Sequence, residues 1–399
     1  MSAVRDLTPE LSTFLPADRR HAIASGAALP EQQDGVVLFA DVADFTPLTE
    51  YMADTLGPRR GAEEVAGTIQ AVFDFLAEAV HRHRGSIITS AGDSLTCWFD
   101  ADHRPSAVAC ALDMQAAADA FTGPPRLLPL GLRVAIAGGT THRLLVGDPA
   151  VQLFDVISGE AADRVGRGEK ACRPGEVVVD RATAGLLAGT LTTGGERGEF
   201  VLVSSLAGTV REDPWPELAE EAIDDATVRR FINPTVHRRL AAGHARFLAE
   251  FRAVGALFVS FDAEDTAALD TMVRLAQATV ADAGGSVFDV STGDKGSYLF
   301  AAFGAPFARG DDVRRAVTAA YELQRQTAST LRIGLHCGQV YTGLYSGRLW
   351  SVYTGKGDVI NVSARLMTNA RTGHPVTGAV EIYPMRDIAI FGKVGRPDW

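Results

Sequence analysis

Three segments of the first half of the chain recur, in the same order, in the second half. This internal repeat limits the possible folds more than any other feature of the sequence. At 399 residues, the chain has room for two copies of one domain, each with its own core. The paired segments are Leu38-Phe39-Ala40-Asp41-Val42 with Leu257-Phe258-Val259-Ser260-Phe261, Gly92-Asp93-Ser94-Leu95 with Gly296-Ser297-Tyr298-Leu299, and Leu130-Gly131-Leu132-Arg133-Val134 with Leu331-Arg332-Ile333-Gly334-Leu335.

In the first copy, apolar runs and amphipathic stretches follow one another in a definite order. The pattern predicts strands at 36–41, on both sides of Asp93 and at 130–137, with helices at 62–82 and 107–121. Strand, helix, strand, strand, helix, strand is the order of the split βαβ unit. We therefore expect an α+β protein made of two ferredoxin-like (βαββαβ) domains.

The repeat also suggests where the domains begin and end. We expect an N-terminal helical segment at 1–34, a first domain at 35–205, a linker and packing helix at 206–252, and a second domain at 253–399. The linker contains an acidic stretch, 211–225. It is interpreted as a solvated connector, with a partner-binding segment as the alternative.

Composition excludes several classes of protein. The net charge is −11 and there is no long basic run, which argues against nucleic-acid binding. No stretch reaches the roughly 18 consecutive apolar residues of a membrane span, and the first residues lack a signal-peptide pattern, so a cytoplasmic protein without membrane contact is expected. The four cysteines are scattered, which favours buried thiols over disulfides or a zinc site.

Two acids of the first copy have the character of metal ligands. Asp41 ends a run of β-forming residues, and Asp93 lies in a Gly-Asp turn between two apolar runs. Mg²⁺ typically takes one or two carboxylates together with phosphate oxygens of the substrate. The second copy has Ser260 and Ser297 at these positions, so only the first copy can bind a metal in this way.

The second copy has its own distinctive pair. Asn361 and Arg365 are four residues apart on a predicted helix and hence on one face, whereas the first copy has Asp163 and Arg167 at the same spacing. Neither copy holds a whole site. A site shared between the copies, with acids from the first and Asn and Arg from the second, would be whole.

Together, Phe39-Ala40-Asp41 with Phe45-Thr46, Gly92-Asp93 and Gly357-x3-Asn361-x3-Arg365 resemble the class III nucleotidyl cyclases. The unequal tandem resembles the catalytic half of soluble, bicarbonate-responsive adenylyl cyclases, over roughly residues 35–385. The resemblance implies that the two domains pair within the chain as a pseudo-heterodimer. It further implies conversion of ATP to 3′,5′-cyclic AMP and pyrophosphate at one composite site, beside a degenerate second site.

The resemblance also assigns roles to residues. Two Mg²⁺ or Mn²⁺ ions would be held by Asp41 and Asp93, with Val42 beside them. Asn361 would orient the ribose, and Arg365 would meet the charge that grows on the α-phosphate. The remaining nucleotide-binding residues would be Ala43, Asp44, Phe45, Thr46, Gly92, Lys295, Thr354, Ile360 and Arg167.

Base recognition depends on how the two copies are aligned. Matching Gly296 to Gly92 puts Lys295 just before the turn, and Lys295 with Thr354 would then read adenine, as in the soluble cyclases. Matching Gly293 to Gly92 offers Asp289 instead, whose carboxylate could accept hydrogen bonds from guanine. The second alignment leaves GTP open as the substrate.

Three departures from the family pattern bear on activity. Asp44 adds negative charge to the phosphate turn, where a small residue is usual, and favours a catalytically weak or silent nucleotide-sensing module as the alternative. Thr89 stands where a lysine helps to hold bicarbonate, so stimulation by bicarbonate is not expected. The mirror site has Ser260, Asp163 and Val156 in place of the functional residues, and should be filled by side chains or bind a regulator.

In relatives, the end of the second copy leads into an ATPase and helical repeats. The chain ends at Trp399. We therefore expect it to be a part of a larger regulator, with an ATPase or regulatory region beyond its C-terminal end.

Overall fold

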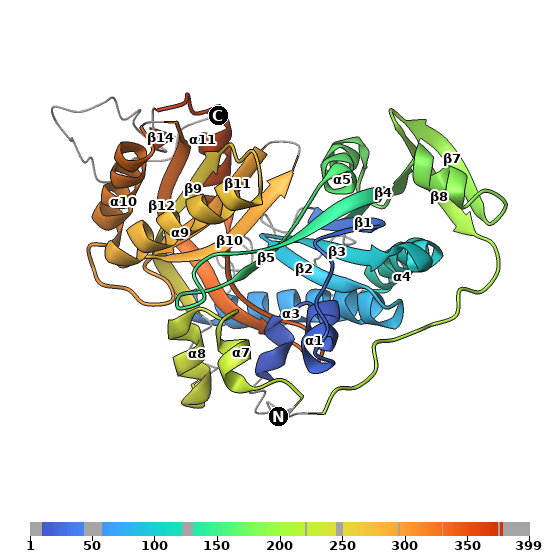
Figure 1. The fold of residues 1–399 in the computed structure, drawn as a ribbon, viewed down its shortest axis with the longest axis horizontal. Coiled ribbons are helices and arrows are strands. Elements are labelled where there is room, and N and C mark those ends of the chain that lie inside the picture. Colours follow the sequence, from blue (N-terminus) through green and yellow to red (C-terminus); the bar gives the residue numbers. More distant parts are fainter. Residues whose placement is uncertain are drawn as a thin grey trace. The chain divides into compact units, whose positions relative to one another are not determined.

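The computed structural model describes residues 10–43, 58–121, 131–219, 222–244, 250–293, 296–328, 330–373 and 376–377 (Figure 1). The chain divides into two compact units, which are described separately below. Unit 1 comprises Met1–Phe251, Ser291–Lys295 and Tyr341–Lys356, and unit 2 comprises Arg252–Val290, Gly296–Val340 and Gly357–Trp399.

Unit 1 is built on a sheet in the order β2-β3-β1-β4-β6-β8-β7, with β5 paired to β4. Its strands are β1 (Gln32–Ala43), β2 (Ser86–Ala91), β3 (Ser94–Asp100), β4 (Gly131–Val146), β5 (Phe154–Ser158), β6 (Val177–Asp180), β7 (Leu191–Arg197) and β8 (Phe200–Leu206). Its helices are η1 (Leu11–Phe14), α1 (Ala17–Ala24), α3 (Pro58–Arg82), η2 (Ala101–His103), α4 (Arg104–Ala120), α5 (Glu160–Ala171), α6 (Arg181–Leu186), α7 (Asp225–Arg229) and α8 (Pro234–Ala241).

β1 lies in the middle of this sheet because both of its faces are apolar. Successive side chains of a strand point to opposite faces. Val36, Leu38 and Ala40 belong to the core that also contains α3 and α4, whereas Val37 and Phe39 belong to the core that contains α5 (Figure 1). The sheet is thus covered by helices on both faces, and β1 pairs antiparallel with both β3 and β4.

The second sheet has the order β10-β11-β9-β12-β13, with β14 paired to β12. Its strand order β10-β11-β9-β12 repeats the order β2-β3-β1-β4 of the first sheet. The α+β fold predicted from the sequence is therefore confirmed. The elements are β9 (Glu250–Phe261), α9 (Thr266–Asp282), β10 (Ser286–Gly293), β11 (Gly296–Phe303), α10 (Asp312–Gln326), β12 (Arg332–Ser346), β13 (Ser351–Lys356), α11 (Asp358–Asn369) and β14 (Val376–Thr377).

The repeat extends to the way in which α3 and α9 end. Gly85 N donates to Val80 O at 2.8 Å, and Gly285 N donates to Val280 O at 2.8 Å. Such contacts close the last turn of a helix. Both glycines are required by close packing, because a Cβ there would lie 2.5 Å from the ring of Phe99 or 2.6 Å from that of Phe303. In both copies, the glycine turn after the helix leads the chain back to the sheet.

The hairpin formed by the end of β12 and β13, Tyr341–Lys356, belongs to unit 1 although it lies in the second repeat. It packs against α3, where the Trp350 ring stacks on Phe73 with centroids 5.9 Å apart. Gln70 exchanges two hydrogen bonds of 3.1 Å with the backbone of Ser346. The contacts therefore place this hairpin in unit 1, and the expected domain bounds stay a prediction.

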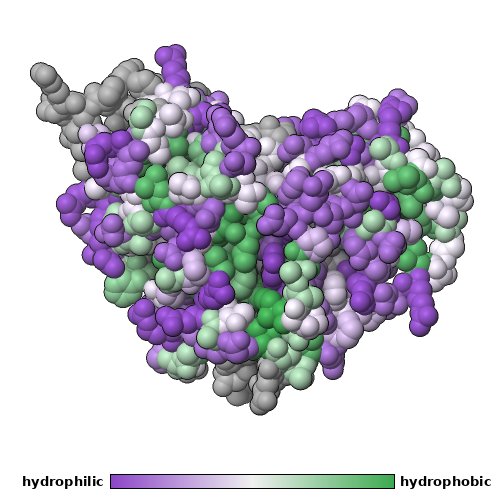
Figure 2. All heavy atoms as spheres, viewed as in Figure 1, coloured by the Kyte–Doolittle hydropathy of each residue, from purple (hydrophilic) through white to green (hydrophobic). Residues whose placement is uncertain are grey.

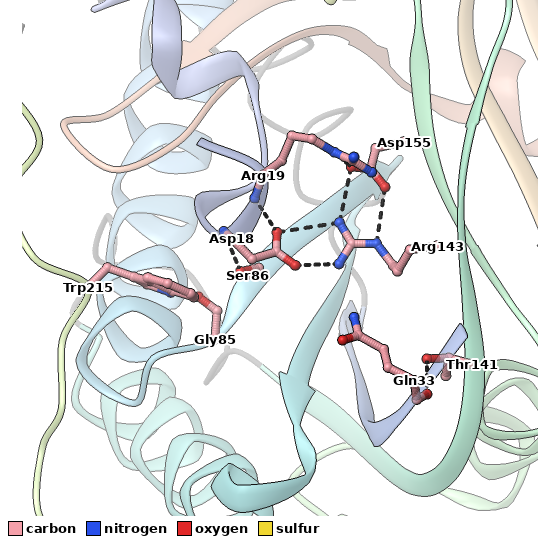
Figure 3. Close-up of polar contacts among 9 residues, drawn as sticks. All are labelled: Asp18, Arg19, Gln33, Gly85, Ser86, Thr141, Arg143, Asp155 and Trp215. Carbon is pink, nitrogen blue, oxygen red and sulfur yellow. Dashed lines mark hydrogen bonds and ion pairs between the residues drawn. The ribbon is translucent and has the colours of Figure 1, made fainter. Parts of the chain in front are cut away.

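Residues 207–214 of the linker are mostly exposed, and the linker is anchored at Trp215. The indole Nε1 of Trp215 donates to Gly85 O at 2.8 Å (Figure 3). The ring also stacks on His21 at a centroid distance of 4.7 Å. Asp213 N donates to Arg82 O at 3.0 Å. This part of the linker is therefore packed along the first unit.

The face drawn in Figure 2 carries mostly hydrophilic residues. Within the described ranges, no helix has the length and apolar content that crossing a membrane requires. The large apolar side chains that are exposed are Leu145, Leu186, Phe307, Val313 and Tyr321.

A buried ion network ties α1 to β4 and β5 (Figure 3). Arg143 donates to Asp18 at 2.5 Å and to Asp155 at 3.0 Å, and Arg19 donates to Asp155 at 2.8 Å. Burial raises the pKa of Asp155, but the charges and hydrogen bonds of Arg143 and Arg19 outweigh it, so the pKa is lowered overall. Each charge in the network depends on its partners, because an unpaired buried charge is costly.

Replacing Arg143 tests this network. Arg143→Met should lower the free energy of unfolding of unit 1 by about 3–5 kcal/mol, because two buried carboxylates lose their shared cation. Urea denaturation at pH 7 measures the loss. The exposed pair Arg181–Glu196 supplies the control, since Arg181→Met should leave the free energy of unfolding nearly unchanged. Equal effects of the two variants would contradict the assignment.

The same network predicts a pH dependence. The pKa of Asp155 is lower in the folded chain than in the unfolded chain, where it is about 3.9. Its contribution to stability is therefore present above about pH 4 and is lost as the pH falls through the folded pKa. The free energy of unfolding, measured against pH, should be higher for the wild type than for Asp155→Asn above about pH 4. The difference should shrink as the pH falls below that value.

Candidate functional site

Strand pairing brings the two predicted metal-binding acids together. Asp41 lies opposite Ser94 in the pairing of β1 with β3, one residue from Asp93. The amide of Val42 donates to the carbonyl of Asp93 at 3.1 Å. Asp41 is buried, at 6% exposure. The two acids therefore meet where β1 ends and β3 begins.

The turn that carries Asp93 depends on a glycine. β2 and β3 are joined by two residues, Gly92 and Asp93, and Gly92 has φ = 59°. Two-residue hairpin loops commonly place glycine at such a position. Ser94 Oγ donates to Ala91 O at 2.8 Å and closes the turn. This short loop fixes the backbone of Asp93 relative to β1.

Burial and mutual repulsion set the charge state of the pair. Burial raises the pKa of Asp93, and the negative charge of Asp41 raises it further. Lys356 and Arg133 act in the opposite direction. Burial and the neighbouring negative charge both disfavour the ionised form of Asp93. A cation placed between the two acids would stabilise that form.

Arg133 is a partner of the acid pair that the sequence reasoning missed. It lies opposite Asp41 in the pairing of β1 with β4, and its Nη2 donates to Asp41 Oδ2. In unit 2, Arg332 donates to Ser260 at 2.9 Å. The arginine is thus present in both copies and the acid in only one. Both repeat segments contain an arginine, but the alignment given above sets Arg133 against Gly334, two positions away from Arg332, so the sequence comparison did not match the two arginines.

Lys356 is the second residue that was missed. It ends β13, it is 5% exposed, and its Nζ donates to Gly92 O. The same Nζ lies 3.8 Å from the ring centroid of Phe73 and 5.0 Å from that of Tyr345. The sequence signal was a lysine at the end of an otherwise uncharged strand.

Thr354 is two positions before Lys356 in β13, so both side chains point to the same face of the sheet. It is buried and pairs with Gly343. Both residues belong to unit 1, as do Asp41 and Asp93. Its predicted role in reading the base stays a prediction.

The predicted ribose and phosphate residues lie on α11 in unit 2. Asn361 is half-buried and Arg365 is exposed, and the two share one face of the helix, as their spacing predicts. The opposite face is held down by Ser363 Oγ, which donates to Ala256 O at 2.7 Å and Gly334 O at 3.0 Å. Ile360 is buried in the core of that unit.

For the other predicted site residues, the structure shows either contacts away from the acid pair or no described position. Arg167 on α5 donates to Glu199 at 2.5 Å at the surface. For Ala43 only the backbone, at the end of β1, is described. Asp44, Phe45, Thr46 and Lys295 lie outside the described residues. Their predicted roles stay predictions.

Strand register bears on the alignment of the copies. Ser260 pairs with Tyr298, as Asp41 pairs with Ser94. Gly296 therefore takes the position of Gly92, and its φ is 84°. This is the alignment that puts Lys295 just before the turn, and Asp289 then lies within β10.

The donor set fits a divalent cation that is shared with a substrate. Within the part of the chain that the structure describes, no cluster of three or more His, Cys, Asp or Glu residues could hold a metal alone. The pair Asp41 and Asp93 offers two carboxylates, the number Mg²⁺ takes when phosphate oxygens and water complete its shell. Together with the raised pKa of Asp93, this fits a cation between the two acids.

Comparison with known proteins identifies the fold around these acids. Residues 29–209 match the family described as the adenylate and guanylate cyclase catalytic domain. This segment contains both acids and is similar to the class III nucleotide cyclases, in agreement with the resemblance of the sequence motifs. Adenylate cyclase type 10 of Oryctolagus cuniculus is 22% identical over 390 residues, covering 84% of this chain and 24% of that protein. The Homo sapiens protein of that name is 22% identical over 389 residues, with the same coverage.

A solved structure covers almost the whole chain. The class III adenylyl cyclase-like ATP-binding protein from Pseudomonas aeruginosa is 11% identical, with a TM-score of 0.55, over 91% of this chain and 91% of that chain. At this identity the similarity shows the fold alone. The chain spans about a quarter of the length of the curated cyclases it matches, 24%.

Two glycines give a test of the acid turn. Gly92 and Gly67 both have open space for a Cβ, but Gly92 has φ = 59° and Gly67 lies within α3. Gly92→Ala should destabilise the chain by about 1–2 kcal/mol through backbone strain alone. Gly67→Ala should stabilise it by up to about 1 kcal/mol. Urea denaturation compares the two, and a shift of the same sign for both would contradict the turn geometry.

Proposed function

We propose that this chain is a nucleotide cyclase that converts ATP to 3′,5′-cyclic AMP and pyrophosphate, using Mg²⁺ or Mn²⁺. The observation that carries the proposal is the meeting of Asp41 and Asp93 at adjacent strand ends, within the segment that matches the cyclase family. Two nearby carboxylates suit phosphate-bound divalent cations.

The reaction requires the ribose 3′-hydroxyl to lose its proton and attack the α-phosphorus, while the bond to pyrophosphate breaks. Two divalent cations, when bound, supply activation of the hydroxyl and neutralise the phosphates. Asp41 and Asp93, with Val42 beside them, would hold these ions. Arg133 already contacts Asp41, and its guanidinium could exchange that carboxylate for a phosphate oxygen.

The second repeat would supply the rest of the site. In this proposal Asn361 orients the ribose, Arg365 meets charge on the α-phosphate, and Lys295 and Thr354 read adenine. The proposed arrangement is a pseudo-heterodimer of domains 35–205 and 253–399. The shared strand order of the two sheets supports it, as does the presence of Thr354 in the unit that holds the acids.

ATP is favoured over GTP on two grounds. The strand register matches Gly296 with Gly92, which keeps Lys295 rather than Asp289 beside the turn. The full-length relatives are named adenylate cyclases, and the similar solved structure is named as ATP-binding. A cytoplasmic location, expected from the composition, and a further ATPase or regulatory region, expected from the resemblance, remain predictions.

A silent nucleotide-binding module is the second candidate. Each acid of the pair has a side-chain cation close by, Arg133 at Asp41 and Lys356 at the turn of Asp93. Asp44 would add negative charge to the phosphate turn. The solved structure with the same fold is described as cyclase-like and ATP-binding. Such a module would bind ATP without forming product.

Product analysis separates these candidates. The chain is incubated with Mn²⁺ and either ATP or GTP, and cyclic nucleotides are quantified. We expect cyclic AMP from ATP, and a loss of about 100-fold or more in Asp93→Asn, because a lost cation removes several kcal/mol of transition-state stabilisation. Asp163→Asn, in the predicted degenerate site, is the matched control and should keep the activity.

The other outcomes are equally informative. Retained affinity for a non-hydrolysable ATP analogue without any cyclic product would favour the silent module. Cyclic GMP as the main product would move the substrate to GTP. Full activity in Asp93→Asn would overturn the assignment of the acid pair.

A further inference from the structure

The ammonium group of Lys356 is enclosed beside the acid pair. Its Nζ donates to Gly92 O, one residue before Asp93, and lies over the face of Phe73 at 3.8 Å. A carbonyl oxygen and aromatic ring faces both favour a cation over a neutral amine. Burial lowers the pKa of Lys356 to about 7, although the negative charge of Asp93 raises it. The carbonyl, the ring faces and Asp93 therefore offset only part of the effect of burial on the ammonium group.

The two cations near the acids differ in exposure. The side chain of Arg133 is 33% exposed. Lys356 is 5% exposed and forms part of the hairpin face that packs on α3. Tyr341 lies directly opposite Lys356 in the pairing of β12 with β13, on the same face. The side chain of Lys356 is consequently enclosed beside the turn.

The first copy carries the acid and lacks the lysine, whereas the second copy carries the lysine and lacks the acid. β4 pairs His142 with Ser158, and β12 pairs Tyr341 with Lys356, so Ser158 is the counterpart of Lys356 in the first copy. The second copy has Ser297 at the position of Asp93. A serine thus replaces the acid in the second copy, and a serine replaces the lysine in the first copy. This correspondence links the charge of Lys356 to that of the acid turn.

We propose that Lys356 is a built-in counter-cation of the Asp41–Asp93 pair, which holds the Gly92–Asp93 turn and keeps the affinity of the pair for a free divalent cation low. It is a positioning residue and touches no substrate. The inference rests on the proposed function of the acid pair as a metal site.

Electrostatics gives the consequence. A free Mg²⁺ or Mn²⁺ ion at the pair meets the repulsion of Lys356, which is strong because the surroundings are buried. A triphosphate brings several negative charges, which offset both the ion and the lysine. The cation and the nucleotide should therefore bind cooperatively, each raising the affinity for the other by the same factor.

Direct metal binding tests this without measuring turnover. Mn²⁺ is titrated into the whole chain at constant near-neutral pH, and free Mn²⁺ is followed by electron paramagnetic resonance, with and without a non-hydrolysable ATP analogue. Lys356→Met keeps the apolar stem and removes the charge. We expect the Kd for Mn²⁺ alone to fall by about tenfold or more, and the gain from nucleotide to shrink.

Two further variants control for the change in packing. Lys356→Gln keeps a donor for Gly92 O without the charge, and should tighten Mn²⁺ binding even if Lys356→Met folds poorly. Arg348→Met removes a positive charge from the same hairpin, at an exposed residue paired with Glu217, and should leave the Kd unchanged.

The sign of the effect decides the question. If Lys356 only braced the turn, removing it would weaken Mn²⁺ binding or leave it unchanged, and either result would overturn the inference. Asp93→Asn separates this failure from failure of the proposed function. If Asp93→Asn abolishes Mn²⁺ binding while the Lys356 variants do not tighten it, only the inference fails. If Asp93→Asn has no effect on Mn²⁺ binding, the acid pair is not the metal site.

Discussion

The antiparallel pairing of β1 with both β3 and β4 is the constraint on which the candidate site depends. One register sets Asp41 beside the turn of Asp93, and the other sets Arg133 opposite Asp41. A slip of one residue in either pairing would turn these side chains to the other face of the sheet. The side chains of β1 pack into cores on both faces of the sheet, so a slip would disrupt the packing of both cores. The chemistry of the site is thus held by the hydrophobic core.

Charge balance is the second organising principle. Two acids share a buried position, and two cations, Arg133 and Lys356, offset them. One cation, Arg133, is partly exposed, while the other, Lys356, lies over aromatic rings. A site of this kind is close to neutral when empty and would become positive on binding a free dication. It is therefore suited to a dication that arrives with a phosphate-bearing ligand.

Much of this could be predicted from the sequence because the signals are local. The repeat, the strand ending in Asp41, the Gly92–Asp93 turn and the shared face of Asn361 and Arg365 all follow from periodicity over a few residues. Arg133 and Lys356 could not be assigned in this way. Their partners are 92 and 264 residues away in the chain, and only strand pairing and hairpin packing bring them together.

The sequence by itself determined the α+β fold, the duplication and which copy carries the acids, because these depend on residue type and short-range spacing. The tertiary structure alone decided that the hairpin Tyr341–Lys356 belongs with unit 1, because aromatic packing against α3 outweighs its place in the chain. It also decided that a lysine of the second repeat lies at the acid turn of the first. Burial removes water from that contact, and the electrostatic energy of a single charge is larger where water is excluded.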